Sequence, residues 1–190
     1  MLILASESLR RRQLLELAGL EFRCEPSHVD ESVPEGLAAE DVPEYLAQKK
    51  AEDIWKAHPD DVVLGADTLV VFEGEILGKP HSDEEAYEML RSLSGEVHHV
   101  YTGVAIHSRE KTVSFTSVTK VEFYDLTDEE IRAYIATGEP RDKAGAYAIQ
   151  GKGSLFIKRI HGDYYTVMGL PLAEVVRHLP ESVKKSGGQA

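Results

Sequence analysis

Two long strand-like segments, separated by only a few residues, limit most strongly what this chain can fold into. They are Val97–His107 and Thr112–Phe123, joined by a turn around Ser108–Glu110. Such a short connection requires an antiparallel pair, because parallel strands need a crossover of about a dozen residues or more. Four apolar residues of the second segment share one parity, as one buried sheet face requires: Val113, Phe115, Val121 and Phe123. The pair argues against a fold of strictly alternating parallel strands and helices.

The remaining elements predict a mixed or antiparallel sheet flanked by helices, an α/β protein. Further strands are predicted at 2–5, 61–72, 75–77, 154–160 and 164–168. Helices are predicted at 9–18, 42–57, 82–94, 127–138 and 171–179. Three of these helices begin with capping-box spacing: Asp41 with Glu44, Ser82 with Glu85, and Thr127 with Glu130. Residues 20–40 and 139–153 are predicted connections, and the polar tail 181–190 is predicted to fray.

Composition excludes several classes of protein. The chain has 190 residues, 42% of them hydrophobic and 28% charged, which disfavours disordered, collagen-like and membrane-embedded proteins. The short apolar start lacks a basic leader and is not a signal peptide. The single cysteine, Cys24, cannot pair within the chain or form a Cys-rich metal site. We therefore expect a cytoplasmic protein.

The charge balance is strongly acidic, with one basic cluster. The 21 basic and 33 acidic residues give a formal net charge of −12, which repels nucleic acid and anionic membranes, so neither is an expected partner. Arg10, Arg11 and Arg12 nevertheless lie together near the start. A basic cluster on an acidic protein indicates a small-anion site rather than a nucleic-acid surface.

The segment Ala5–Arg12 is the first candidate site. A predicted strand leads into a turn that contains Ser6 and Ser8, and the turn begins a helix, whose free N–H groups and dipole favour an anion. Arginines in a first helical turn oppose the dipole, and a bound phosphate would remove that conflict while accepting guanidinium hydrogen bonds. The alternative is that Ser8 merely caps the helix and the arginines are solvated.

The segment Gly65–Thr68 is the second candidate site, because it places Asp67 inside an apolar strand. A buried carboxylate is costly unless it is paired, hydrogen-bonded or metal-bound. The nearby glycine permits close approach of a ligand or of backbone. One interpretation is a carboxylate that holds a metal ion or a water, and the other is a buried Asp that accepts hydrogen bonds from loop N–H groups.

Two further segments carry candidate contacts. Gly74–Pro80 is one residue short of a P-loop and has Pro80 where Ser or Thr must bind Mg²⁺, so a P-loop NTPase is excluded. Lys79 in this segment is either a phosphate contact or a surface lysine. The loop Asp142–Gly151 is typical of loops that line a pocket, and its Gln150 offers a donor and an acceptor that could match the edge of uracil or thymine. The alternative is a plain structural loop.

Taken in order, these segments resemble the Maf family, cytoplasmic nucleoside triphosphate pyrophosphatases first described as septum-formation proteins. The family's opening motif, LASxSPRRxxLL, resembles residues 4–15. Its GADT, LGKP, LSGxxHxVxTGV, DKAGAYGIQG and VGLPL motifs resemble residues 65–68, 77–80, 93–104, 142–151 and 168–172. Each motif is weak alone, but their order and spacing across residues 2–180 make the likeness specific.

The resemblance implies a fold, an activity and a cofactor. The implied fold is similar to the inosine-triphosphatase architecture, a mixed, largely antiparallel sheet flanked by helices, with two lobes around a deep groove. One catalytic domain would span residues 1–180, followed by the polar tail 181–190. The implied reaction is hydrolysis of a nucleoside triphosphate between the α and β phosphates, with Mg²⁺ or Mn²⁺ as cofactor, in a homodimer.

The resemblance also extends to the family branch that acts on dTTP, UTP and some modified pyrimidine nucleotides. That branch carries an Arg in the first motif, a Thr after the motif Asp and a Gln in the GIQG block. Arg10, Thr68 and Gln150 match all three, and the branch thought to act on 7-methyl-GTP has different residues there.

Roles for single residues follow from the same resemblance. Phosphate contacts are implied for Ser6, Arg10 and Arg11, and further basic contacts for Lys50 and Lys79. Glu31 and Asp67 are the implied metal-binding carboxylates, with Asp67 also catalytic. The family names this Asp as proton acceptor, but an Asp beside a metal ion and lysines is a poor base at neutral pH. We therefore expect Asp67 to orient a water, while the metal supplies acidity and the cations neutralise the departing pyrophosphate.

Two positions depart from the family pattern. Leu9 replaces the usual Pro, which removes only preorganisation of the helix start, so the anion site is expected to survive. Ala148 replaces the usual Gly of GIQG. If position 148 needs a positive φ, Ala costs on the order of 1 kcal/mol and shifts Gln150.

The alternative function is non-enzymatic. The same groove could bind nucleotides or nucleic acid in a regulator of cell division. The acidic balance of the chain argues against nucleic acid.

Overall fold

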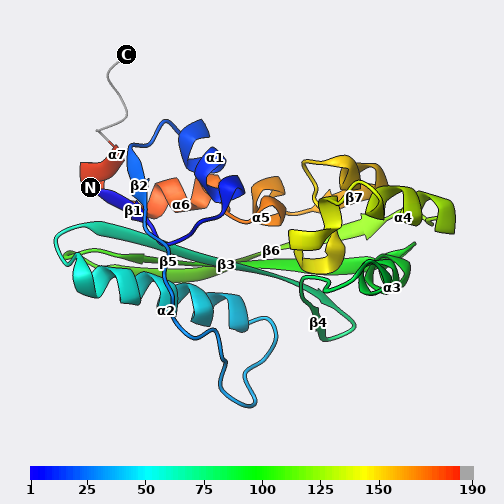
Figure 1. The fold of residues 1–190 in the computed structure, drawn as a ribbon. Helices are drawn as coiled ribbons and strands as arrows, with labels where there is room; N and C mark the ends of the chain where they lie inside the picture. The colour runs from blue at the N-terminus through cyan, green and yellow to red at the C-terminus, as the bar shows by residue number, and fades with distance from the viewer. Residues whose placement is uncertain (185–190) are drawn as a thin grey trace. The chain divides into compact units, whose positions relative to one another are not determined.

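The computed structural model describes residues 1–184 and contains a seven-stranded mixed sheet (Figure 1). The strands are β1 (Leu2–Leu4), β2 (Phe22–Cys24), β3 (Val62–Phe72), β4 (Glu75–Leu77), β5 (Val97–His107), β6 (Thr112–Phe123) and β7 (Ile157–His161). Their order is β2-β1-β3-β5-β6-β7, with β4 paired to β3. β1 is parallel to both β2 and β3, whereas β4 is antiparallel to β3 and β7 is antiparallel to β6. The predicted α/β class with a mixed sheet is confirmed.

Helices follow single strands, the pair β3 and β4, and the pair β5 and β6, and three of them come in succession after β7. The α-helices are α1 (Leu9–Leu17), α2 (Val42–Ala57), α3 (Asp83–Leu93), α4 (Asp128–Ile135), α5 (Tyr164–Met168), α6 (Leu172–His178) and α7 (Glu181–Lys184). Three 3₁₀ turns follow α4: η1 (Glu139–Asp142), η2 (Ala144–Ala146) and η3 (Lys152–Phe156). No helix within residues 1–184 is long and apolar enough to cross a membrane.

The chain divides into two units, and β3, β5 and β6 each contribute residues to both. Unit 1 comprises Met1–Asp67, Thr102–Ser117 and the described residues from Gly169 onward. Unit 2 comprises Thr68–Tyr101 and Val118–Met168. The single domain over residues 1–180 and the groove between two lobes stay predictions.

In unit 1, α2 packs on one face of the strands, and α1 and α6 lie on the other face (Figure 1). Small residues dominate the α2 contact, where Ala47, Ala51 and Ile54 meet Val63 and Ala105. Gly103 of β5 is essential to the short distance between helix and sheet. A Cβ atom there would lie 2.1 Å from the carbonyl carbon of Pro43 and 2.2 Å from the backbone nitrogen of Glu44.

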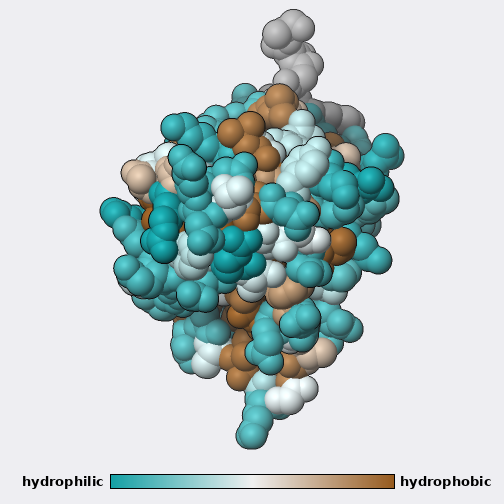
Figure 2. Space-filling model, turned by 90° about the vertical axis from the view of Figure 1, so that its right-hand side faces the viewer, coloured by the Kyte–Doolittle hydropathy of each residue, from teal (hydrophilic) through white to brown (hydrophobic). Residues whose placement is uncertain are grey.

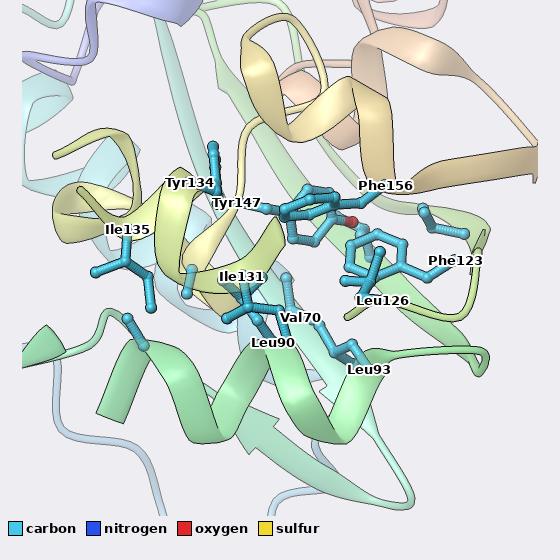
Figure 3. Close-up of a cluster of buried hydrophobic side chains, with 14 residues drawn as sticks. Val70, Leu90, Leu93, Phe123, Leu126, Ile131, Tyr134, Ile135, Tyr147 and Phe156 are labelled. Carbon is cyan, nitrogen blue, oxygen red and sulfur yellow. The ribbon is translucent and has the colours of Figure 1, made fainter. Parts of the chain in front are cut away.

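Unit 2 has its own core, built from α3, α4, the 3₁₀ turns and the parts of β3, β5 and β6 that belong to this unit (Figure 3). Leu90 and Leu93 of α3 are fully buried, as is Ile131 of α4. The rings of Tyr147 and Phe156 pack edge-on against Phe123, with centroids 4.9 and 6.0 Å away. α4 is fixed at its start by the predicted capping box between Thr127 and Glu130, which is confirmed.

The face of the molecule shown in Figure 2 is mostly polar, in keeping with the net charge of −12. Hydrophilic side chains cover most of the face shown in Figure 2, and hydrophobic ones form scattered patches. Scattered apolar residues of this kind are ordinary on a water-facing surface.

Several local predictions were wrong. Residues 20–40 contain a strand, β2, and Tyr164–Met168 form helix α5 rather than a strand. The predicted strand 154–160 begins later, at Ile157, after the turn η3. Asp41 precedes α2 but makes no side-chain capping hydrogen bond. Within the predicted tail, Glu181–Lys184 form α7, and residues 185–190 lie outside the described part of the chain.

Replacing Gly103 by Ala tests the close helix–sheet contact. The added methyl group would collide with the backbone of α2, and such overpacking costs about 1–3 kcal/mol or more of the free energy of unfolding. The measurement is urea denaturation. The matched control is Gly78→Ala, because a Cβ atom at Gly78 meets nothing within 4 Å. Equal midpoints for the two variants would show that α2 does not depend on this contact.

Candidate functional site

The turn between β1 and α1 forms the first part of the site. Ser8 caps α1, because its Oγ accepts a hydrogen bond from the N–H of Arg11 at 3.4 Å. The N–H of Ser8 in turn donates to Oγ of Ser6 at 3.1 Å. The N–H of Ala5 donates to the carbonyl of Leu64 at 2.8 Å, which fixes the turn to β3. The first turn of α1 therefore begins at a rigid strand end, as expected of an anion site.

Arg11 folds back over this turn. Its Nε donates to the carbonyl oxygen of Gly169 at 2.8 Å, and its Nη1 donates to Oγ of Ser6 at 3.4 Å. Burial lowers the pKa of Arg11; the charges of Asp67 and Glu31 act in the opposite direction, and that of Arg10 adds to the lowering. Ser8 does cap the helix, but Arg11 is not simply solvated.

Lys50 joins the two predicted carboxylates. Its Nζ lies 2.7 Å from Oδ1 of Asp67 and 2.8 Å from Oε1 of Glu31. The side chains of Lys50 and Asp67 are each 13% exposed, whereas that of Glu31 is 60% exposed. The buried carboxylate of Asp67 is therefore paired, and the pair opens toward solvent on the side of Glu31.

Gly65 allows α2 to bring Lys50 to Asp67. A Cβ atom on Gly65 would lie 2.4 Å from the carbonyl oxygen of Ala47 and 2.9 Å from Cβ of Ala51. These two alanines flank Lys50 on α2. The close approach predicted at this glycine is therefore an approach of helix backbone.

Glu31 lies on a segment without helix or strand, and Lys49 anchors that segment to α2. The Nζ of Lys49 donates to the carbonyl oxygens of Asp30 at 2.5 Å and Ser32 at 3.3 Å. The N–H of Ser32 also donates to Oδ1 of Asp30 at 3.1 Å. Adjacent lysines of one helix thus hold Glu31, one through its side chain and one through its flanking backbone.

In unit 2, Lys79 is exposed and lies two residues after the end of β4. The carbonyl of Gly78 accepts a hydrogen bond from the N–H of Gly145 at 3.1 Å, so the turn that bears Lys79 is attached to the loop 142–151. Thr68 begins unit 2 and is half-buried.

Gln150 is exposed on a turn in which the N–H of Gly151 donates to the carbonyl of Ala148 at 3.2 Å. The expected strain at Ala148 is absent, because the non-glycine residue of this loop with positive φ is Ala146, at 60°. The substitution of Ala for the family's Gly at position 148 therefore requires no unusual backbone conformation. The departure gives no reason to expect a shifted Gln150.

Unit 1 brings six predicted residues into one neighbourhood: Ser6, Arg10, Arg11, Glu31, Lys50 and Asp67. Thr68, Lys79 and Gln150 belong to unit 2, and their convergence with the first set stays a prediction. Sequence reasoning missed Lys49 and the carbonyl of Gly169. Lys49 could have been noticed as the neighbour of Lys50 on the same predicted helix, but a backbone acceptor leaves no signal in side-chain chemistry.

The site offers few ligands to a metal ion. Among residues 1–184, no three His, Cys, Asp or Glu side chains gather closely enough to hold one. Asp67 and Glu31 supply two carboxylates with a shared lysine between them. Mg²⁺ commonly binds one or two carboxylates and completes its shell with waters and substrate phosphates, so this donor set fits a metal that arrives with a phosphate ligand.

Comparison with known proteins gives a consistent result over almost all of the chain. A sequence model of the family described as Maf-like protein matches residues 1–182. A protein of Geobacillus sp. (strain WCH70) named dTTP/UTP pyrophosphatase is 56% identical over 178 residues, which are 94% of this chain and 96% of that protein. A protein of Bacillus mycoides (strain KBAB4) with the same name is 53% identical over 180 residues, 95% of this chain and 94% of that protein.

Solved structures are similar at a lower level. A HAM1 protein from Coxiella burnetii superposes with a TM-score of 0.49 and 17% identity, over 93% of this chain and 96% of that one. The Staphylococcus aureus Ham1 protein gives 0.47 and 17%, over 65% and 72%. Since both TM-scores lie below 0.5, the fold assignment rests on the strand order instead.

Replacing Lys50 by Met tests the shared ion pair. The variant leaves the carboxylate of Asp67 buried without its cation, and the expected loss is about 3 kcal/mol of unfolding free energy. The double variant Lys50→Met with Asp67→Asn removes the buried charge and is expected to recover part of that loss, as a double-mutant cycle in urea would measure. Lys56→Met is the matched control, because the ion pair of Lys56 with Glu52 on the same helix is exposed. A Lys50→Met protein as stable as this control would contradict the pairing.

Proposed function

Because this chain belongs to the Maf-like protein family, we propose that it is a dTTP/UTP pyrophosphatase, an enzyme that hydrolyses these nucleotides to the monophosphate and pyrophosphate. The relatives named above support the activity and the substrates. The observation that carries the proposal is the cluster in unit 1, where Arg11 and Lys50 lie with Asp67 and Glu31 near the start of α1. Cations for phosphate and carboxylates for a divalent ion are what a metal–triphosphate complex needs.

The start of α1 is the proposed binding site for the phosphates. Backbone N–H groups of its first turn, the Ser6 hydroxyl and the guanidinium groups of Arg10 and Arg11 are donors suited to phosphate oxygens. The Nε of Arg11 donates a hydrogen bond to the carbonyl of Gly169, and this contact orients the rest of the planar guanidinium group. Lys50 and Lys79 supply further positive charge.

Mg²⁺ or Mn²⁺ is the proposed cofactor, with Asp67 and Glu31 as its protein ligands. When bound, such an ion adds positive charge at the phosphates and acidity to water. Lys50 bridges the same two carboxylates, so its ammonium keeps them close together in the free protein. The arrangement is suited to a metal that binds together with the nucleotide.

Asp67 is the proposed catalytic residue. Its ion pair and burial fix the carboxylate in one place, so it is suited to orient the attacking water. The α–β phosphoanhydride bond breaks, water supplies the new oxygen, and pyrophosphate leaves with its charge neutralised by the arginines and lysines. Positioning and electrostatics, rather than a strong base, supply most of the acceleration in this account.

Selection of the base is assigned to Arg10, Thr68 and Gln150, the three residues that match the pyrimidine branch. The amide of Gln150 presents one donor and one acceptor, which can pair with N3–H and O4 of uracil or thymine. We also propose that the protein is a homodimer and that it works in the cytoplasm.

Incubation with dTTP, UTP, dCTP and GTP in the presence of Mg²⁺ tests the proposed function. Pyrophosphate and the monophosphate are expected from dTTP and UTP, identified by phosphorus NMR. Release of orthophosphate in steps would indicate a different phosphatase. Binding without turnover of any nucleotide would favour the alternative, a non-enzymatic regulator of cell division.

Asp67→Asn is the decisive variant in this assay. The expected result is a fall in kcat of about 100-fold or more, with nucleotide binding partly retained. Asp41→Asn is the matched control, since Asp41 is exposed and its side chain caps nothing. Turnover of the Asp67 variant close to that of the control would remove Asp67 from the chemistry.

Metal binding is expected to depend on the nucleotide. Titration of Mn²⁺ into the free protein should show weak binding, because two carboxylates are only part of a coordination shell. Addition of α,β-imido-dTTP, which resists cleavage, should tighten binding in the wild type and less so in Glu31→Gln. Tight Mn²⁺ binding without nucleotide, unchanged in Glu31→Gln, would contradict the assignment.

A further inference from the structure

The carboxylate of Glu139 attaches one side of the turn that presents Gln150 to the rest of unit 2. Oε1 of Glu139 accepts hydrogen bonds from the hydroxyl of Tyr134 at 2.8 Å and from the N–H of Gly153 at 3.1 Å. Oε2 of Glu139 accepts from the N–H of Lys152 at 3.1 Å. These contacts fix the backbone that leaves the turn on its C-terminal side.

Tyr134 fixes the other side of the same turn. Its hydroxyl oxygen accepts a hydrogen bond from the N–H of Ala148 at 3.2 Å while its proton is donated to Glu139. The ring is buried and packs edge-on against Phe156, with centroids 4.9 Å apart (Figure 3). Two side chains therefore hold both ends of the turn Ala148–Gly151, with Gln150 between them.

Two glycines of this segment, Gly151 and Gly153, lie so close to Glu139 and Tyr134 that a side chain at either position would not fit. A Cβ atom on Gly151 would lie 2.4 Å from Oε1 of Glu139, and one on Gly153 would lie 2.9 Å from the hydroxyl of Tyr134. Substitution at either position would push the turn away from these side chains. The backbone around Gln150 is therefore fitted closely to Glu139 and Tyr134.

The protonation states suit this arrangement. Burial acts to raise the pKa of Glu139, but hydrogen bonds from Tyr134, Gly153 and Lys152 outweigh it, and the pKa lies below its ordinary value. Burial, together with the neighbouring Glu139, raises the pKa of Tyr134. At neutral pH, Glu139 is an acceptor for all three hydrogen bonds and Tyr134 keeps its proton.

We infer that Glu139 and Tyr134 are positioning residues for base selection, because they hold the turn that presents Gln150. The inference rests on the proposed role of Gln150. An amide distinguishes uracil or thymine from cytosine only if it is held in place, since cytosine carries an acceptor at N3 and a donor at N4 where thymine carries a donor and an acceptor. A loosened turn would let the amide adapt to either base.

The test compares kcat/KM for dTTP with that for dCTP in Glu139→Gln and Tyr134→Phe. Glu139→Gln presents an NH₂ group to donors that need an acceptor, and Tyr134→Phe removes the hydroxyl while keeping the packed ring. Each is expected to lower the dTTP/dCTP ratio about tenfold, through a higher KM for dTTP with kcat changed little. Glu129→Gln is the matched control, an exposed acid in the first turn of α4.

A loss of kcat/KM that is equal for both nucleotides would show a merely structural role and overturn the inference.

Gln150→Ala separates this inference from the function on which it rests. If Gln150→Ala lowers the ratio but Glu139→Gln and Tyr134→Phe do not, the inference is wrong while the role of Gln150 stands. If Gln150→Ala leaves the ratio unchanged, the role of Gln150 is wrong, and the inference with it. If the wild-type chain releases no pyrophosphate, the same comparison is made with dissociation constants.

Discussion

The ammonium group of Lys50 is the contact on which the rest of the candidate site depends. It lies within 2.8 Å of both Asp67 and Glu31, so two carboxylates that would repel one another share a cation. Its position comes from packing, because Gly65 and Gly103 let the backbone of α2 approach the sheet. Two glycines in the strands therefore decide where a charge on a helix is placed.

The chain is acidic as a whole but basic at one place. Its net charge of −12 keeps the surface acidic, yet Arg11 and Lys50 gather where the first turn of α1 begins and β3 carries Asp67. A site with cations alone would bind phosphate without fixing a metal ion, and a site with carboxylates alone would repel the triphosphate. The presence of both is what relates this geometry to a metal-dependent reaction on a nucleotide.

Much of the fold could be predicted from the sequence where periodicity and local chemistry agree. The hairpin of β5 and β6, the whole of α2 and the capping box at Thr127 are of this kind. Residues 164–168 look like a strand by composition, but the carboxylate of Asp163 accepts hydrogen bonds from the N–H and hydroxyl of Thr166 and starts α5. β2 consists of only three residues, all half-buried or exposed, so its own sequence shows no strand pattern. It forms a strand because it pairs with β1.

The site shows the same limit. Asp67 could be recognised in the sequence because a carboxylate inside an apolar strand is costly to bury. The contacts of Lys49, Glu139 and Tyr134 could not, because they are hydrogen bonds to backbone atoms that are remote in sequence.

A crystal structure with α,β-imido-dTTP and Mn²⁺ tests the account most directly, since Mn²⁺ can be located by its anomalous scattering. The account predicts Mn²⁺ on Asp67 and Glu31, with the triphosphate against Ser6 and Arg11. A triphosphate bound away from the start of α1, or Mn²⁺ away from both carboxylates, would contradict it.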